Sequence, residues 1–227
     1  MTSFAERDVI CGHCGQAQMV QVLLSTNRSG YPDLDLRPPP MMRDTLHVQV
    51  QCCGACGYCA ADIAIQPDAQ AAVVIAGAEY LNTLQREDLP LTARQMLCRG
   101  LLEAAADQPL RAAWSVLKAA WVCDDANVAA APWRELAVAH FLRAMAADQM
   151  PCEDVGLSQA LLADLWRRSG HFDKAIAMAE SGLALKSSAG LGRNIEDILR
   201  YQILLANQCD TTCHDVYEAE RAAVRGR

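Results

Sequence analysis

The chain has 227 residues, of which 52 % are apolar, enough for one medium-sized domain or two small ones with a hydrophobic core. Its 20 lysines and arginines are outnumbered by 27 aspartates and glutamates, and the net charge of −7 disfavours non-specific binding to nucleic acid, which depends on a basic surplus. The longest strongly apolar run, residues 71–78, is far shorter than the ~20 residues that a membrane-spanning helix needs. Because the first ten residues do not resemble a signal peptide, we expect a cytoplasmic protein without a membrane segment.

The eleven cysteines are unevenly distributed, since six of them precede residue 60. An odd number without an export signal argues against a disulfide framework and favours thiol or metal chemistry. All four tryptophans lie in the second half of the chain. We therefore expect two regions with different sources of stability.

Three segments of the first region have strand-like lengths and are rich in Val, Ile and Leu: residues 19–24, 45–51 and 60–65. Polar and apolar residues alternate strictly over 45–51, which predicts a half-buried strand. In the third segment, Ile63 and Ile65 are expected on one face. Residues 27–43 contain Gly-Tyr-Pro and a run of three prolines, so we expect a long ordered loop.

From about residue 68 the apolar positions recur with helical spacing. Residues 68–86 predict one helix that links the two regions. Thr92 is the expected N-cap of the next helix, and Pro109 and Pro132 stand near the starts of two more, where a missing N–H costs least. The helices predicted after the linker cover residues 93–106, 110–123, 133–147, 155–168, 172–185, 191–207 and 211–224.

One predicted helix pair, residues 156–189, has the pattern of a tetratricopeptide repeat, whose period is about 34 residues. Small residues such as Ala163 and Gly182 let two helices approach closely, while Trp166 and Phe172 fill the space beside them. We expect both aromatic residues to be core residues of this unit rather than parts of a ligand site. An irregular helical bundle is the alternative.

The most specific signal is a C-x-x-C-G motif that occurs twice, at residues 11–15 and 53–57. A two-residue gap brings two thiolates to one side of a tight turn, and the glycine accommodates a backbone that aims amides at the sulfurs. One copy alone would also suit thioredoxin-like redox chemistry. Two copies, each next to a predicted strand, supply four thiolates for a tetrahedral zinc (Zn2+) ribbon; a paired redox site and an iron cluster are the alternatives. The predicted zinc ligands are Cys11, Cys14, Cys53 and Cys56.

Cys52 and Cys59 flank the second motif, but only Cys53 and Cys56 reproduce the register of the first. Cys59 is then either a small residue packed behind the site, or a spare ligand or redox thiol. His13 lies inside the first motif, and we expect it to point to solvent. Because four cysteine ligands leave no position for water, we expect the zinc to hold strands together rather than to catalyse hydrolysis. Metal binding should be inseparable from local folding.

The two motifs and residues 32–38, Pro-Asp-Leu-Asp-Leu-Arg-Pro, resemble uncharacterised bacterial proteins that contain a domain of unknown function. In those proteins paired zinc knuckles precede tetratricopeptide-like helices, and the resemblance covers most of the chain. Proline often follows the first cysteine of their knuckles, whereas this chain has Gly12 and Gly54 there. The resemblance implies this architecture and no activity.

Two further groups of residues have candidate chemistry. Asp33 and Asp35 could be paired carboxylates for acid–base chemistry or for a second metal, but we expect them to cap turns and to pair with Arg37. Cys209 and Cys213, beside a histidine, could be half of another metal site; we expect single buried cysteines near a helix end. The sequence contains no G-x-S-x-G, P-loop, H-E-x-x-H or dinucleotide-binding motif.

The sequence therefore predicts an α+β fold with a zinc-ribbon domain over residues 1–66, a helical linker over 67–90, and an all-α tetratricopeptide-like domain over 91–227. We expect a protein–protein interaction module, an adaptor or scaffold that binds a protein or peptide, and not an enzyme. One alternative is a nucleic-acid-binding zinc-ribbon protein, which the acidic balance of both regions disfavours. Another is a thiol-based redox sensor that uses Cys52 or Cys59.

Overall fold

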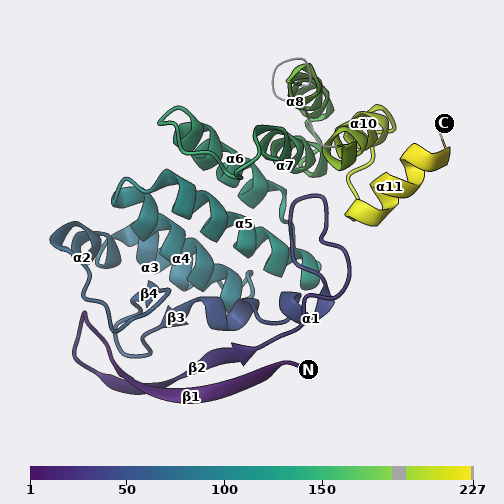
Figure 1. Cartoon of the computed structure of the whole chain (residues 1–227). Coiled ribbons are helices and arrows are strands. Elements are labelled where there is room, and N and C mark those ends of the chain that lie inside the picture. Colours follow the sequence, from purple (N-terminus) through teal and green to yellow (C-terminus); the bar gives the residue numbers. More distant parts are fainter. Residues whose placement is uncertain (186–192, 226–227) are drawn as a thin grey trace.

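The structure, a computed structural model, describes residues 1–185 and 193–225 and shows two small β-hairpins followed by helices (Figure 1). The predicted α+β class is confirmed at this level. Two predicted features reach outside the described residues: the first two residues of the helix over 191–207 and the last four residues of the repeat unit over 156–189.

Each C-x-x-C-G motif forms the turn of a hairpin. Strands β1 (Ser3–Ile10) and β2 (Ala17–Ser25) pair antiparallel on either side of the first motif, and the short strands β3 (Gln51–Cys52) and β4 (Cys59–Ala60) do so around the second. Sequence analysis predicted β2 but missed β1. The reason is that β1 carries three charged residues and buries Val9 alone, so it lacks the apolar alternation of a half-buried strand.

The strand predicted over residues 45–51 is wrong. The chain instead forms helix α1 (Pro40–Arg43) and the 3₁₀ turn η1 (Leu46–Gln49). Only Gln51, the last residue of the predicted strand, belongs to β3. The amide of Val48 donates to the carbonyl oxygen of Thr45 (3.2 Å), which closes the tight turn. Alternation alone does not distinguish this turn from a strand, because Leu46 and Val50 are buried in both arrangements.

The strand predicted over residues 60–65 is also wrong beyond its first residue, since β4 ends at Ala60. Ile63 is buried and Ile65 is 65 % exposed, so the two side chains do not share a face. The backbone leaves the sheet here because the carbonyl oxygen of Ile63 accepts a hydrogen bond from the amide of Gly12 in the first motif (2.8 Å).

Helices α2 (Ala69–Ile75) and α3 (Ala78–Leu84) replace the single helix predicted over 68–86. Asp68 caps α2 by accepting a hydrogen bond from the amide of Ala71 (2.7 Å), and Gly77 lies between the two helices. Tyr80 of α3 is buried against the second hairpin. Its hydroxyl donates to the carbonyl oxygen of Gly57 (2.9 Å) and accepts from the amide of Cys59 (3.0 Å), so α3 packs directly on the hairpin.

The remaining helices follow the sequence prediction closely, except that the last begins at Val216 rather than at residue 211. Pro109 and Pro132 lie in first helical turns as expected. Thr92 is not an N-cap, because the helix already begins one residue before it. The helices are α4 (Leu91–Ala105), α5 (Pro109–Asp125), α6 (Ala131–Met145), α7 (Val155–Arg168), α8 (Phe172–Ala184), α10 (Arg193–Asn207) and α11 (Val216–Arg225).

Two apolar clusters lie within the fold. The larger extends from Val9 in β1 through α4, α5 and α6 to Leu165 in α7, and the smaller joins Leu34 to α7, α8, α10 and α11. Close approach of the two helices of the predicted unit is confirmed at Gly182, because a Cβ added there in α8 would lie 3.0 Å from the Cβ of Gln159 in α7. The tetratricopeptide character stays a prediction.

The expectation that Trp166 and Phe172 are core residues is wrong, since both are only partly buried. Trp166 lies near the end of α7, where one side of its ring packs on the larger apolar cluster. Its face is covered by the ammonium group of Lys174, 4.2 Å from the ring centroid. With a cation over one ring face and only partial burial, Trp166 lies at the edge of the core.

A fully buried carboxylate, Asp35, fixes the loop between β2 and α1 on the helices. Its Oδ2 accepts hydrogen bonds from Nε1 of Trp121 (2.8 Å) and from Arg168 (2.9 Å), and its Oδ1 accepts from the amide of Arg37 (3.2 Å). The guanidinium of Arg134 lies 3.8 Å from the same carboxylate. Residues far apart in sequence thus converge on one negative charge, and the loop reaches the end of α5 in Figure 1.

The expected pairing of both aspartates with Arg37 is wrong. The guanidinium of Arg37 pairs with Asp125 at the end of α5, and Asp33 pairs with Arg43 (2.7 Å). Only the turn-capping part of the expectation is confirmed, by the bond between Asp35 and the amide of Arg37. The side-chain partners depend on which helix end faces the loop, which no local pattern encodes.

Another buried arginine, Arg167, joins the C-terminal elements. It donates to Gln202 of α10 (2.8 Å), to Asp164 of α7 (2.6 Å), and to the carbonyl oxygens of Asp210 (2.7 Å) and Thr212 (2.9 Å). Helices α7 and α10 and the segment before α11 therefore share one fully buried side chain.

Over residues 1–185 and 193–225, no helix has both the length and the apolar composition needed to cross a membrane.

Replacement of Asp35 by Ala should destabilise the protein by about 3–5 kcal/mol, because it removes the buried acceptor of Trp121 and Arg168 and leaves Asp124 as the single carboxylate that pairs with both Arg134 and Arg168. Urea unfolding followed by circular dichroism measures this change. Asp88→Ala is the control, since it removes a carboxylate from a solvent-exposed pair with Arg86 and should leave the midpoint unchanged. Equal midpoints for the two variants would contradict the role given to Asp35.

Candidate metal centre

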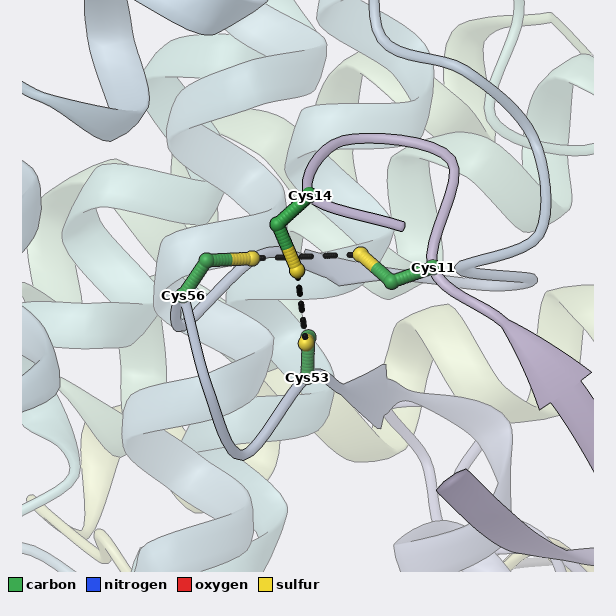
Figure 2. Close-up of side chains that lie close together, drawn as sticks. All are labelled: Cys11, Cys14, Cys53 and Cys56. Carbon is green, nitrogen blue, oxygen red and sulfur yellow. Dashed lines mark hydrogen bonds between the residues drawn. The ribbon is translucent and has the colours of Figure 1, made fainter. Parts of the chain in front are cut away.

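Cys11, Cys14, Cys53 and Cys56 converge at the tips of the two hairpins (Figure 2). All four Sγ atoms lie within 4.8 Å of one another. The Sγ atoms of Cys11 and Cys56 are 3.8 Å apart, and those of Cys14 and Cys53 are 3.6 Å apart, so both contacts join one motif to the other. The four cysteines singled out by the motifs could therefore bind one metal ion.

The two motifs have the same backbone conformation. In each, the amide of the glycine donates to the carbonyl oxygen of the first cysteine at 2.8 Å, from Gly15 to Cys11 and from Gly57 to Cys53. The φ angles of Gly15 and Gly57 are 75° and 74°, in the left-handed region that disfavours side chains with a Cβ. The expected reason for a glycine after the second cysteine is confirmed.

Backbone amides also point at the sulfurs, as expected. At Cys53 burial favours the neutral thiol, but hydrogen bonds from the amides of Cys56 and Ala55 outweigh it and lower the pKa of Cys53 to about 7. Burial raises the pKa of Cys11 and of Cys56. Because a metal binds thiolates, binding must displace protons from the neutral thiols, and metal affinity should fall as the pH is lowered.

Side-chain and backbone hydrogen bonds hold the two motifs against each other. The side chain of Gln18 in β2 accepts from the amide of Gly54 (3.0 Å) and donates to the carbonyl oxygen of Cys52 (3.1 Å). In addition, the amide of Gly12 in the first motif donates to the carbonyl oxygen of Ile63, which follows the second motif in the chain. Sequence reasoning missed Gln18, because its role exists only once the hairpins are docked and no local pattern marks it.

Gly12 and Gly54 occupy the same position in the two motifs but differ in their surroundings. A Cβ on Gly12 would lie 2.6 Å from the backbone nitrogen of Gln66 and 2.7 Å from the carbonyl carbon of Ile65. A Cβ on Gly54 would meet nothing within 4 Å. A proline at position 12 would in addition remove the amide that bonds to Ile63, so the structure gives a physical reason for glycine in the first motif.

The centre lies at the protein surface. Cys11 and Cys53 are buried and Cys56 is partly buried, whereas Cys14 is exposed. His13 is exposed, as expected.

Cys52 and Cys59 lie outside the group of four. Cys59 is fully buried behind the second motif, which supports its interpretation as a packed residue. The pKa of Cys52 is raised, most strongly by a hydrogen bond with Cys59 and next by burial. At Cys59 the hydrogen bond with Cys52 lowers the pKa, but a hydrogen bond with Cys98 together with burial raises it overall. Both are neutral thiols at pH 7.

The other candidate site residues do not form a second metal group in the part of the chain that the structure describes. Cys209 and Cys213 are exposed, so the expectation of buried cysteines is wrong. His214 lies between Asp210 (3.0 Å) and Glu218 (3.1 Å), which contact opposite ring nitrogens and so do not converge with the imidazole on one point.

Comparisons with protein-family models, with characterised proteins and with solved structures found no match. The geometry of the site therefore carries the functional argument, and the resemblance based on the motifs stays a prediction.

Replacement of Gly12 by Ala should destabilise the protein by about 1–3 kcal/mol, because the new Cβ meets backbone atoms that have no room to move. Gly54→Ala is the matched control and should be close to neutral. Thermal unfolding of the metal-loaded proteins gives the comparison. A larger effect at Gly54 than at Gly12 would contradict the docking of the first motif on residues 63–66.

The double variant Cys53→Ser/Cys56→Ser should lose the metal, since two serines replace half of the thiolates. Elemental analysis of the purified protein, normalised to protein concentration, should give one metal ion per wild-type chain and almost none in the variant. Cys209→Ser/Cys213→Ser is the matched control. Full occupancy in the first variant would refute the assignment of these ligands.

Proposed function

We propose that the protein is a zinc-binding protein–protein interaction module, in which a four-thiolate zinc ribbon stabilises the N-terminal region and the helices provide a binding groove for a peptide segment. The observation that carries the proposal is the convergence of four cysteine sulfurs, and nothing else, on one point.

The donor set and its dimensions favour zinc. Four thiolates at a Zn–S distance of about 2.3 Å form a tetrahedron with edges of about 3.8 Å. The contacts of 3.6 and 3.8 Å between the two motifs match these edges before any ion is added. An iron–sulfur cluster distributes its cysteines over several irons and needs a wider set of sulfurs, so a single ion fits better.

The same geometry supports a structural rather than a catalytic role. A tetrahedral ion with four protein ligands has no position left for water or substrate, whereas catalytic zinc sites keep one open. Zinc binding would instead stabilise the two small hairpins, which have no hydrophobic core of their own.

The helical region has a groove of about 450 Å³ between α6, α7 and α8. Its lining combines an indole, two flexible methionines and a single cation, a composition typical of surfaces that bind apolar peptide side chains. The lining residues are Leu142, Met145, Gln159, Trp166, Lys174, Ala177, Met178 and Ser181. The incomplete burial of Trp166, which sequence analysis placed in the core, is thereby explained.

Nucleic-acid binding, the alternative function, receives little support. Besides the net charge of −7, several arginines that could contact phosphates already pair with carboxylates, with at least one member of each pair buried. These arginines are Arg37, Arg43, Arg134, Arg167 and Arg168.

Selection from a displayed random-peptide library against the zinc-loaded full chain tests the groove. Ala177→Asp should weaken binding of the selected peptides by at least about tenfold, since it places a charge among apolar contacts at an exposed position where the fold tolerates it. Val73→Asp is the control, because Val73 is an apolar residue of α2 that is 70 % exposed and lies outside the groove. Fluorescence anisotropy gives both affinities.

Peptides whose affinity is equal for wild type and Ala177→Asp would show that the groove is not the binding surface. Salt-sensitive, sub-micromolar binding of a random oligonucleotide would favour the alternative function instead.

A further inference from the structure

Cys52 and Cys59 are directly opposite each other in the second hairpin, on β3 and β4. The backbone groups of these two residues bond to side chains outside the hairpin rather than to each other. The amide of Cys59 donates to the hydroxyl of Tyr80, and the carbonyl oxygen of Cys52 accepts from the side chain of Gln18. The backbone hydrogen bond between the two strands forms at the next pair toward the turn, from the amide of Cys53 to the carbonyl oxygen of Tyr58 (2.9 Å). Cys52 and Cys59 therefore form a non-hydrogen-bonded pair, whose Cα atoms are typically about 4.5 Å apart.

This spacing falls within the range of about 4.4–6.8 Å that a disulfide bond spans. Directly opposite side chains also lie on the same face of a hairpin. Both sulfurs approach the carbonyl oxygen of Gly57, at 3.5 Å from Cys52 and 3.3 Å from Cys59. The two side chains thus lie on one face of the hairpin, beside the same carbonyl oxygen.

We propose that Cys52 and Cys59 are a site of reversible oxidation, at which a hydroperoxide converts the two thiols into a cross-strand disulfide behind the metal centre.

The reaction begins at Cys52, because its side chain is partly exposed whereas Cys59 is fully buried. The sulfur of Cys52 attacks the peroxide, the O–O bond breaks, and an S–O bond forms to give a sulfenic acid with release of one water or alcohol. The sulfur of Cys59 then attacks that of Cys52, the S–O bond breaks, the S–S bond forms, and water leaves with the thiol proton of Cys59. Two thiols lose two electrons and two protons, and the peroxide is reduced.

Two features make this pair distinct from the other cysteines. The four clustered sulfurs of the metal centre are held for the ion, whereas Cys52 and Cys59 remain outside that group. The disulfide would close a ring that contains Cys53 and Cys56, so it would hold the ends of the second motif together in addition to the metal.

The test uses the zinc-loaded full chain, treated with hydrogen peroxide and then with catalase. Free thiols are blocked with light iodoacetamide under denaturing conditions with a chelator, disulfides are reduced, and the new thiols are labelled with heavy iodoacetamide. Fragment ions should show heavy label on Cys52 and Cys59 at least about fivefold above that on the buried Cys98, because only the first two are paired for exchange. Zinc content, measured before denaturation, should be unchanged.

Two variants separate the pair from its neighbours. Cys52→Ser, at a partly exposed position, should abolish the heavy label on Cys59, whereas Cys98→Ala should leave the label on both residues. Zinc content and circular dichroism identify any variant that fails to fold.

Three results would overturn the proposal. Light label on Cys52 and Cys59 after prolonged oxidation would show that they do not pair. Heavy label on Cys59 that depends on Cys98 would place the bond elsewhere, and heavy label on Cys53 or Cys56 with loss of zinc would make the metal centre the site of oxidation.

Discussion

The N-terminal region depends on the docking of two hairpins that share no strand ladder. Within the described residues, β1 pairs only with β2 and β3 only with β4. What holds the two tips together is the cluster of four sulfurs, the side chain of Gln18 and the bond from Gly12 to Ile63. With so few backbone bonds between the hairpins, an ion at the centre of the sulfurs would be the main link between them. Tyr80 then connects this assembly to the helices through its hydroxyl.

The ligand cluster could be predicted from sequence because its determinants are local. The C-x-x-C-G segment forms the same turn in both places where it occurs in this chain, so the spacing and the glycine specify the conformation. The surroundings of the turns could not be predicted in this way. Gly12 and Gly54 are indistinguishable by position, yet only Gly12 faces another backbone, and Gln18 acquires its partners from a segment more than thirty residues away.

The long helices were predicted well because Pro109 and Pro132 mark where two of them start and because apolar residues recur with helical spacing through their interiors. Short elements were predicted poorly. Residues 45–51 alternate as a strand does, but a 3₁₀ turn buries the same two apolar residues, and the charged β1 gave no signal. The contacts of Asp35 illustrate the remaining limit, since its partners Trp121 and Arg168 are set by helix packing across most of the chain.

Arg167 has a consequence for recognition. Its guanidinium is fully buried, and its bonds to Gln202, Asp210 and Thr212 fix α10 and the segment before α11 relative to α7. Any shift of α10 against α7 would break the hydrogen bonds that Gln202 makes with Arg167 and Asp164, and each buried polar group left without a partner costs about 1–3 kcal/mol. Helix α8 packs on both α7 and α10, so the wall that it contributes to the groove is held in place before any ligand arrives. A segment entering that groove would lose its own conformational entropy but would not have to order the protein as well, and preorganisation of this kind lets a small apolar contact area support measurable affinity.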